Sequence, residues 1–256
     1  MGRDGGNART LRVKALMGVV IGATMVAPRG EAQTAGRGFL FRPPLGSVTL
    51  AAGFSHAAAR GDLFADARTN LTLGRSAFDA ISLGADVAWR VTPRLDATLG
   101  ASYAGSSARS AYRGWLDQND APIEQTTSFE RVPVTVGLNV YLLPRERSIG
   151  RFAWIPRRYA LYVGASAGAA WYRYRQKGDF VDYQTSNVFA DVFRSSAWTP
   201  AAQGLGGMDI SLSPTLALVA QTRYLWARGQ LGPDFSGYHR IDLSGLSTTL
   251  GFTVRF

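Results

Sequence analysis

The residues LSGLSTTLGFTVRF, Leu243–Phe256, close the chain and alternate in character with a period of two. One face carries Leu246, Thr248, Leu250, Phe252, Val254 and Phe256, and the other is small or polar. This alternation predicts a β-strand with one face in an apolar medium. The stretch is longer than the five or six residues usual in soluble sheets. Tilted by about 45°, it reaches roughly 33 Å, which is enough to cross the apolar band of a membrane.

Seven earlier stretches alternate in the same way, and we expect strands at 47–55, 81–91, 95–106, 129–143, 159–175, 200–212 and 216–227. Two connections between them are tight turns, at 92–94 and 213–215, and 144–158 is of medium length. The others are long, and we expect loops at 56–80, 105–128, 176–198 and 228–242. Short turns that alternate with long loops predict an all-β fold, an eight-stranded antiparallel up-and-down transmembrane β-barrel. An edge strand of a soluble sandwich is the alternative.

Within the third long connection, apolar residues recur at helical spacing. They are Val188, Phe189, Val192 and Phe193. This pattern predicts one or two turns of helix that cover the mouth of the barrel.

The first 32 residues have the pattern of a secretory signal peptide. A basic segment that ends at Lys14 precedes the apolar run Ala15–Ala27, and small residues precede Gln33. The run is too short for a spanning helix. We therefore expect a cleaved leader at 1–32, an irregular lead-in at 33–46 and a barrel at 47–256, located in the cell outer membrane.

Composition narrows the function classes. The 256 residues include no Cys, which excludes disulfides, thiol catalysis and Cys-based metal sites. The net charge is +10, and without the leader 23 basic and 16 acidic residues leave +7. In an exported chain this charge points to phosphate-bearing lipid rather than nucleic acid. Outer-membrane lipids and lipopolysaccharide are the expected partners, and we expect no cofactor.

Charged residues fall on the inward face of several strands. They are Asp86, Arg90, Asp96, Arg131, Asp209, Arg223 and Arg255. An eight-stranded barrel is just wide enough for side chains to fill, and an unpaired buried charge is costly, so these groups should pair into a plug. A narrow conduit lined by Asp86, Arg90, Arg223 and Arg255 is the alternative.

Catalysis would depend on two histidines, His56 and His239. A lipid-modifying barrel enzyme would need one of them beside a Ser and an acidic residue at the outer rim. Neither stands at a recognisable spacing from such residues, so we predict that the chain is not an enzyme.

The connection 144–158 is rich in arginine, with Phe152, Trp154 and Ile155 between the basic positions. Its arginines are Arg145, Arg147, Arg151, Arg157 and Arg158. Basic and aromatic residues at a membrane edge suit contact with lipid phosphates of the inner leaflet. A periplasmic partner or simple solvation would account for the same composition.

Taken together, these features resemble the small eight-stranded bacterial outer-membrane proteins, namely the barrel domain of outer-membrane protein A and its X and W relatives. The resemblance covers residues 47–256. It implies that Phe252, Val254 and Phe256 form the signal read by the barrel-insertion machinery, after transit with periplasmic chaperones. It also implies a monomer with a structural, adhesive or loop-mediated binding role, or a channel for small or hydrophobic solutes.

Overall fold

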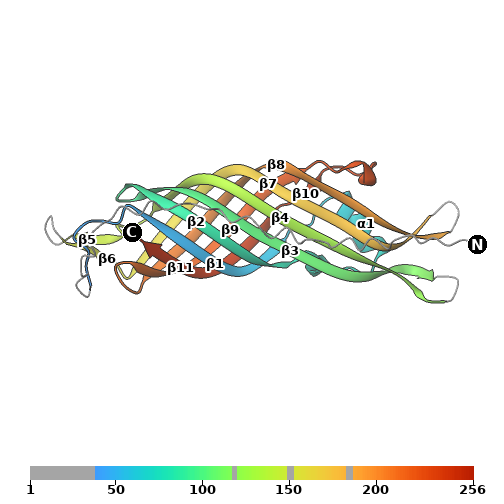
Figure 1. The fold of residues 1–256 in the computed structure, drawn as a ribbon, viewed down its shortest axis with the longest axis horizontal. Coiled ribbons are helices and arrows are strands. Elements are labelled where there is room, and N and C mark those ends of the chain that lie inside the picture. The colour runs from blue at the N-terminus through green and yellow to red at the C-terminus, as the bar shows by residue number, and fades with distance from the viewer. Residues whose placement is uncertain (1–37, 117–119, 149–152, 183–186) are drawn as a thin grey trace, which may run out of the picture. The chain divides into compact units, whose positions relative to one another are not determined.

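The structure is a computed structural model that describes residues 38–116, 120–148, 153–182 and 187–256. The expected signal peptide and the start of the lead-in lie outside these residues. Figure 1 shows the elements in chain order. They are β1 (Gly46–Ala57), α1 (Asp62–Asn70), η1 (Arg75–Phe78), β2 (Ala80–Thr92), β3 (Leu95–Leu116), β4 (Pro122–Tyr141), β5 (Glu146–Ser148), β6 (Trp154–Pro156), β7 (Tyr159–Val181), β8 (Val188–Ser211), β9 (Leu216–Gly229), η2 (Pro233–Phe235), β10 (Ile241–Asp242) and β11 (Gly245–Arg255).

Eight of these strands close into an antiparallel ring in the order β1-β2-β3-β4-β7-β8-β9-β11. The last strand pairs with the first, with Leu50 opposite Phe252. Phe256 completes the closure, because its backbone N–H donates to Gly46 and its carbonyl accepts from Leu45 and Gly46. The predicted eight-stranded barrel is therefore confirmed.

The two faces of the ring differ as the alternation predicted. Large apolar side chains on the outward positions are exposed, for example Leu50 at 64% and Leu250 at 61%. Their inward neighbours are polar or small, and buried examples are Ser55, Thr249 and Thr253. A continuous apolar exterior of this kind is what a surrounding lipid phase requires.

Four strands run far beyond the predicted bounds. β3, β4, β7 and β8 contain 22, 20, 23 and 24 residues, whereas β1, β2, β9 and β11 contain 11 to 14. The loops predicted at 105–128 and 176–198 are thus largely wrong. Outside the apolar band both strand faces meet polar surroundings, so the hydrophobic contrast that identifies a strand disappears there.

The predicted turn of helix at Val188–Phe193 is also wrong, since this segment belongs to β8. The Phe193 ring of this segment packs edge-on against the Phe180 ring of β7, with the ring centroids 4.5 Å apart. Pairing with β7 along the whole segment, as in the opposition of Phe180 and Phe189, overrides the local helical spacing.

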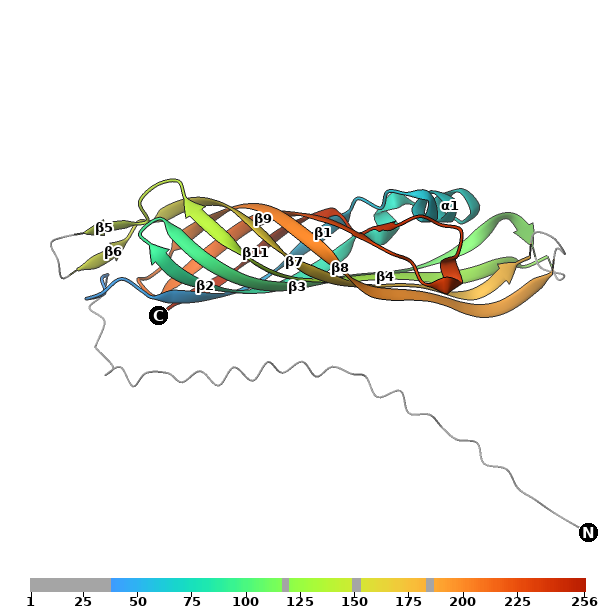
Figure 2. The same cartoon turned by 90° about the horizontal axis from the view of Figure 1, so that it is seen from above.

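Three connections for which no regular structure was predicted contain regular elements. The loop after β1 forms α1 and η1, the connection 144–158 forms the small hairpin of β5 and β6, and the connection 228–242 contains η2 and β10. α1 lies at one end of the barrel, and β5, β6 and the C-terminus lie at the other (Figures 1 and 2). We call these the long-loop end and the short-turn end. Among the described residues no helix is long and apolar enough to cross a membrane.

Candidate functional site

At the short-turn end the interior is filled by ion pairs. The two terminal nitrogens of Arg145, Nη1 and Nη2, donate to the Asp96 carboxylate at 2.6 Å, and Arg90 donates to Glu146 at 2.7 Å. Asp96 has a side chain that is 5% exposed. The guanidinium of Arg145 also lies over the Tyr141 ring, 4.4 Å from its centroid. The connection 144–158 therefore reaches into the mouth of the barrel.

Halfway along the barrel Arg223 of β9 pairs with Asp86 of β2 across the interior. Gln221 supports the pair, because its Oε1 accepts from Nε of Arg223 at 2.9 Å. Gly100 of β3 makes room for it, since a Cβ there would overlap Oδ1 of Asp86. A second crossing pair joins Arg255 and Asp209 at 3.7 Å.

Arg131 of β4 is the exception among the inward charges. It is 3% exposed, yet it makes no ion pair with any residue that the structure describes. Its guanidinium donates to the carbonyls of Leu243 and Ser244 at 2.9 and 3.3 Å and to the Ser55 hydroxyl at 3.0 Å. The side chain thus fastens the start of β11 to the inner wall.

The charged residues predicted to face the barrel interior pair with one another only in part. Asp86 meets Arg223 and Asp209 meets Arg255, whereas Asp96 and Arg90 pair with residues of the connection 144–158. Sequence reasoning missed this because it expected that connection to meet lipid, a periplasmic partner or solvent, and not the barrel interior. Of its arginines, Arg145 turns inward, Arg157 is half-buried, Arg147 and Arg158 are exposed, and Arg151 lies outside the described residues.

Between the ion pairs the interior holds three water-sized cavities of about 30, 40 and 20 Å³. Arg223 borders the first, Asp86 the second, and Asp209 the second and third. Oε1 of Gln203 and Oδ1 of Asn139 are buried beside these cavities without a protein hydrogen-bond partner. Each cavity is large enough for a water molecule.

At the long-loop end the interior is closed by aromatic rings, which we call the aromatic plug: Phe64, Phe78, Phe129, Tyr174 and Phe235. Phe64 of α1 stands at its centre, with edge-on contacts to Phe78, Phe129 and Tyr174 at centroid separations of 4.9, 5.4 and 5.9 Å. Phe64 and Tyr174 have no exposed surface. The plug shuts off the polar interior at this end.

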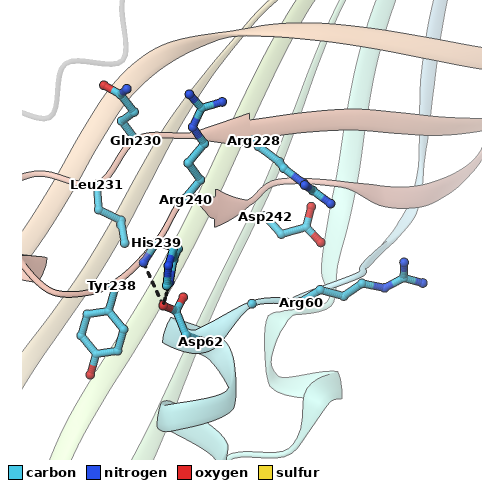
Figure 3. A pocket seen from close by; sticks show the side chains of 10 residues that line it. Arg60, Asp62, Arg228, Gln230, Leu231, Tyr238, His239, Arg240 and Asp242 are labelled. Atoms are coloured by element: carbon cyan, nitrogen blue, oxygen red, sulfur yellow. Dashed lines mark hydrogen bonds and ion pairs between the residues drawn. The ribbon is translucent and has the colours of Figure 1, made fainter.

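Two adjoining cavities of about 780 Å³ each open on the surface at the long-loop end. Both are lined by Arg60, Arg228 and Arg240 together with Gln230 and Asp242 (Figure 3). The three arginines are exposed and Asp242 is buried. This basic surface hollow was not foreseen, because its arginines come from three segments that only the fold brings together.

The rim of the hollow is held by a contact between two loops. Oδ2 of Asp62, the first residue of α1, accepts from the backbone N–H of His239 at 2.8 Å and contacts Nδ1 of the same residue at 2.7 Å (Figure 3). These two bonds, the backbone one first, lower the pKa of the Asp62 carboxyl from 3.8 to about 2. Tyr238 adds a bond to Asp66 at 2.9 Å.

The two histidines considered as catalysts take part in carboxylate contacts. His56 contacts Asp79 through Nδ1 at 2.7 Å, as His239 contacts Asp62. Among the described residues neither imidazole is bonded to a serine, and no group of three side chains could hold a metal ion. His56 thus ties the end of β1 to the residue that precedes β2, and His239 ties the last long connection to α1.

No family model and no curated protein matches the chain. Solved structures do resemble it. OprG of Pseudomonas aeruginosa is 13% identical with a TM-score of 0.45, covering 85% of this chain and 99% of its own. Neisserial surface protein A is 13% identical with a TM-score of 0.44, covering 82% and 96%. The outer membrane protease OmpT of Escherichia coli is 10% identical with a TM-score of 0.32, covering 88% and 100%. The solved structures that this chain resembles are outer-membrane β-barrels, which is the class that the sequence pattern predicted.

Proposed function

We propose that this chain is a non-enzymatic outer-membrane protein whose barrel is closed to solutes and whose long-loop end binds a ligand at the cell surface. The exposed apolar band supports the membrane location, because soluble proteins rarely leave such a surface uncovered. Both chain ends of a barrel of this kind lie on the periplasmic side. The long-loop end then faces outward.

The observation that carries this proposal is the aromatic plug. Its central ring, Phe64, comes from the connection between β1 and β2, so the chain folds part of its own outer loop into the mouth. Buried aromatic rings packed edge-on resist displacement by water. A conduit for solutes would need this mouth open.

The expected partners during assembly follow from the last strand. Phe252, Val254 and Phe256 are all more than half exposed on the outward face, where an insertion machinery can reach them. Within the closed ring each strand is paired on both sides, so no second copy is required to complete it; the outer parts of β3 and β8, beyond the ring, pair with one strand only. We propose a monomer in contact with outer-membrane lipids.

A narrow channel is the second candidate, and the three water-sized cavities favour it. They lie one after another beside Asp86, Arg223 and Asp209, so a displaced plug would leave only the crossing ion pairs in the path. Rings of charged side chains are a common means of selecting ions in a pore.

Single-channel recording in a planar bilayer separates the two candidates. The refolded chain is compared with Arg223→Ala, which removes the central ion pair, and with Arg109→Ala, a control on the exposed surface of the β3–β4 hairpin. We expect no discrete openings in any of the three, because the aromatic plug remains in place. Openings in the unaltered chain whose size or frequency changes only in Arg223→Ala would establish the channel and refute the closed barrel.

A further inference from the structure

Three exposed arginines converge at the long-loop end, and we call them the arginine rim: Arg60, Arg228 and Arg240. Arg60 follows β1, Arg228 lies near the end of β9, and Arg240 precedes β10. Both surface cavities have all three in their walls. A guanidinium group presents five N–H donors in a planar fork that matches phosphate oxygens.

The arginine rim is not neutralised by its neighbours. Within the described part of the chain none of the three guanidinium groups forms an ion pair. Of the two carboxylates in the same walls, Asp62 is engaged by His239, and Asp242 is buried and accepts the backbone N–H of Ser244 at 3.1 Å. Three exposed guanidinium groups thus face one partly exposed carboxylate, that of Asp62, so the net exposed charge that a ligand would meet is positive.

The hollow continues onto the lipid-facing wall of the barrel. Tyr224, Trp226 and Arg228 follow one another at every second position of β9, and the Tyr224 and Trp226 rings lie 4.7 Å apart. Trp198 on the neighbouring strand is 61% exposed and lines the same cavity. Aromatic rings gather at the interface between acyl chains and headgroups, so Arg228 lies one step further out, at headgroup level.

The adjacent strand pair carries two further exposed arginines. Arg175 of β7 lies directly opposite Arg194 of β8, and both side chains are exposed. Like charges directly opposite each other destabilise a sheet. The Asp234 carboxylate accepts the backbone N–H of Arg194 at 3.0 Å, and among the described residues neither guanidinium forms an ion pair, so an anion bound here would lessen the repulsion.

We infer that the arginine rim binds the phosphate groups of a phosphorylated glycolipid in the outer leaflet of the membrane. The inference rests on the outer-membrane location proposed above and names the ligand of the long-loop end. A lipid is favoured over free phosphate because one cavity joins the arginines to Trp198 and Trp226, which would contact acyl chains. Each arginine near a membrane surface contributes about fivefold to the affinity for anionic lipid.

The test uses the refolded full chain in phosphatidylcholine nanodiscs. Binding of diphosphorylated lipid A, of the same lipid without phosphates, and of glucose 1-phosphate is followed by tryptophan fluorescence and native mass spectrometry. The triple variant Arg60→Gln, Arg228→Gln and Arg240→Gln is compared with Arg42→Gln, Arg75→Gln and Arg94→Gln. The second set removes the same charge from exposed positions that line neither cavity.

We expect the diphosphorylated lipid to bind most tightly, and its affinity to fall by roughly a hundredfold in the rim variant but by less than threefold in the control. Equal binding of the lipid without phosphates, or an equal loss in both variants, would overturn the inference. Tight binding of glucose 1-phosphate alone would replace the lipid with a soluble phosphate. A chain that does not enter nanodiscs would instead contradict the membrane location, and heat-dependent gel mobility verifies that each variant is folded.

Discussion

The two halves of the barrel interior are filled by opposite chemistry. The short-turn half contains ion pairs that cross the interior, such as Arg223 with Asp86, separated by cavities that can hold water. The long-loop half contains the aromatic plug, with Phe64 fully buried at its centre and the buried Arg131 packed against Phe129. One eight-stranded ring can therefore be filled by paired charges in one half and by aromatic packing in the other.

The largest difference between the halves should appear when the centre of the plug is removed. Phe64→Ala deletes a fully buried ring, and we expect it to lower the free energy of unfolding by about 4 kcal/mol. Urea unfolding in detergent micelles measures this. The matched control Phe189→Ala, at a ring that is 42% exposed, should cost about 1 kcal/mol or less. Equal costs would mean that the plug is not a packed core.

An intermediate effect is expected at the central ion pair. Gly100→Ala places a methyl group against the Asp86 carboxylate and forces it away from Arg223, at a cost of about 1–3 kcal/mol. Gly206→Ala in β8 is the control, since a Cβ there meets nothing within 4 Å. The same unfolding measurement applies to both. If Gly100→Ala left the free energy of unfolding unchanged, the short-turn half would accommodate the added methyl group, in contrast to the tightly packed plug.

The smallest effect concerns the loop contact above the plug. Because the folded pKa of Asp62 is depressed to about 2, its bonds to His239 are present above the unfolded value of 3.8. They are lost as the pH falls through about 2. The NMR shift of the His239 amide should therefore titrate with a midpoint near 2, and Asp62→Asn should abolish that transition. A midpoint near 3.8 would mean that the contact is not maintained in solution.

The sequence predicted the parts of the strands inside the apolar band well and the parts outside it poorly. Strands inside the apolar band were predictable, because Leu250 and Thr249 alternate against two different media. The outer parts of β7 and β8 were not, since Phe189 and Phe193 there no longer face lipid on one side. The partners of charged residues were equally hidden: Asp86 and Arg223 are 137 positions apart, and Arg145 comes from a connection that was expected to meet lipid, a partner or solvent.

The alternation alone predicted the eight ring strands within the apolar band and the closing strand that ends at Phe256, because a period of two is a local property of each segment. Which side chains fill the barrel interior, and which line the surface hollow, depends on the tertiary structure. The aromatic plug, the crossing ion pairs and the arginine rim each join side chains from segments far apart in the chain. Such long-range contacts depend on the strand register and on how the loops fold back, and no local sequence pattern predicts either.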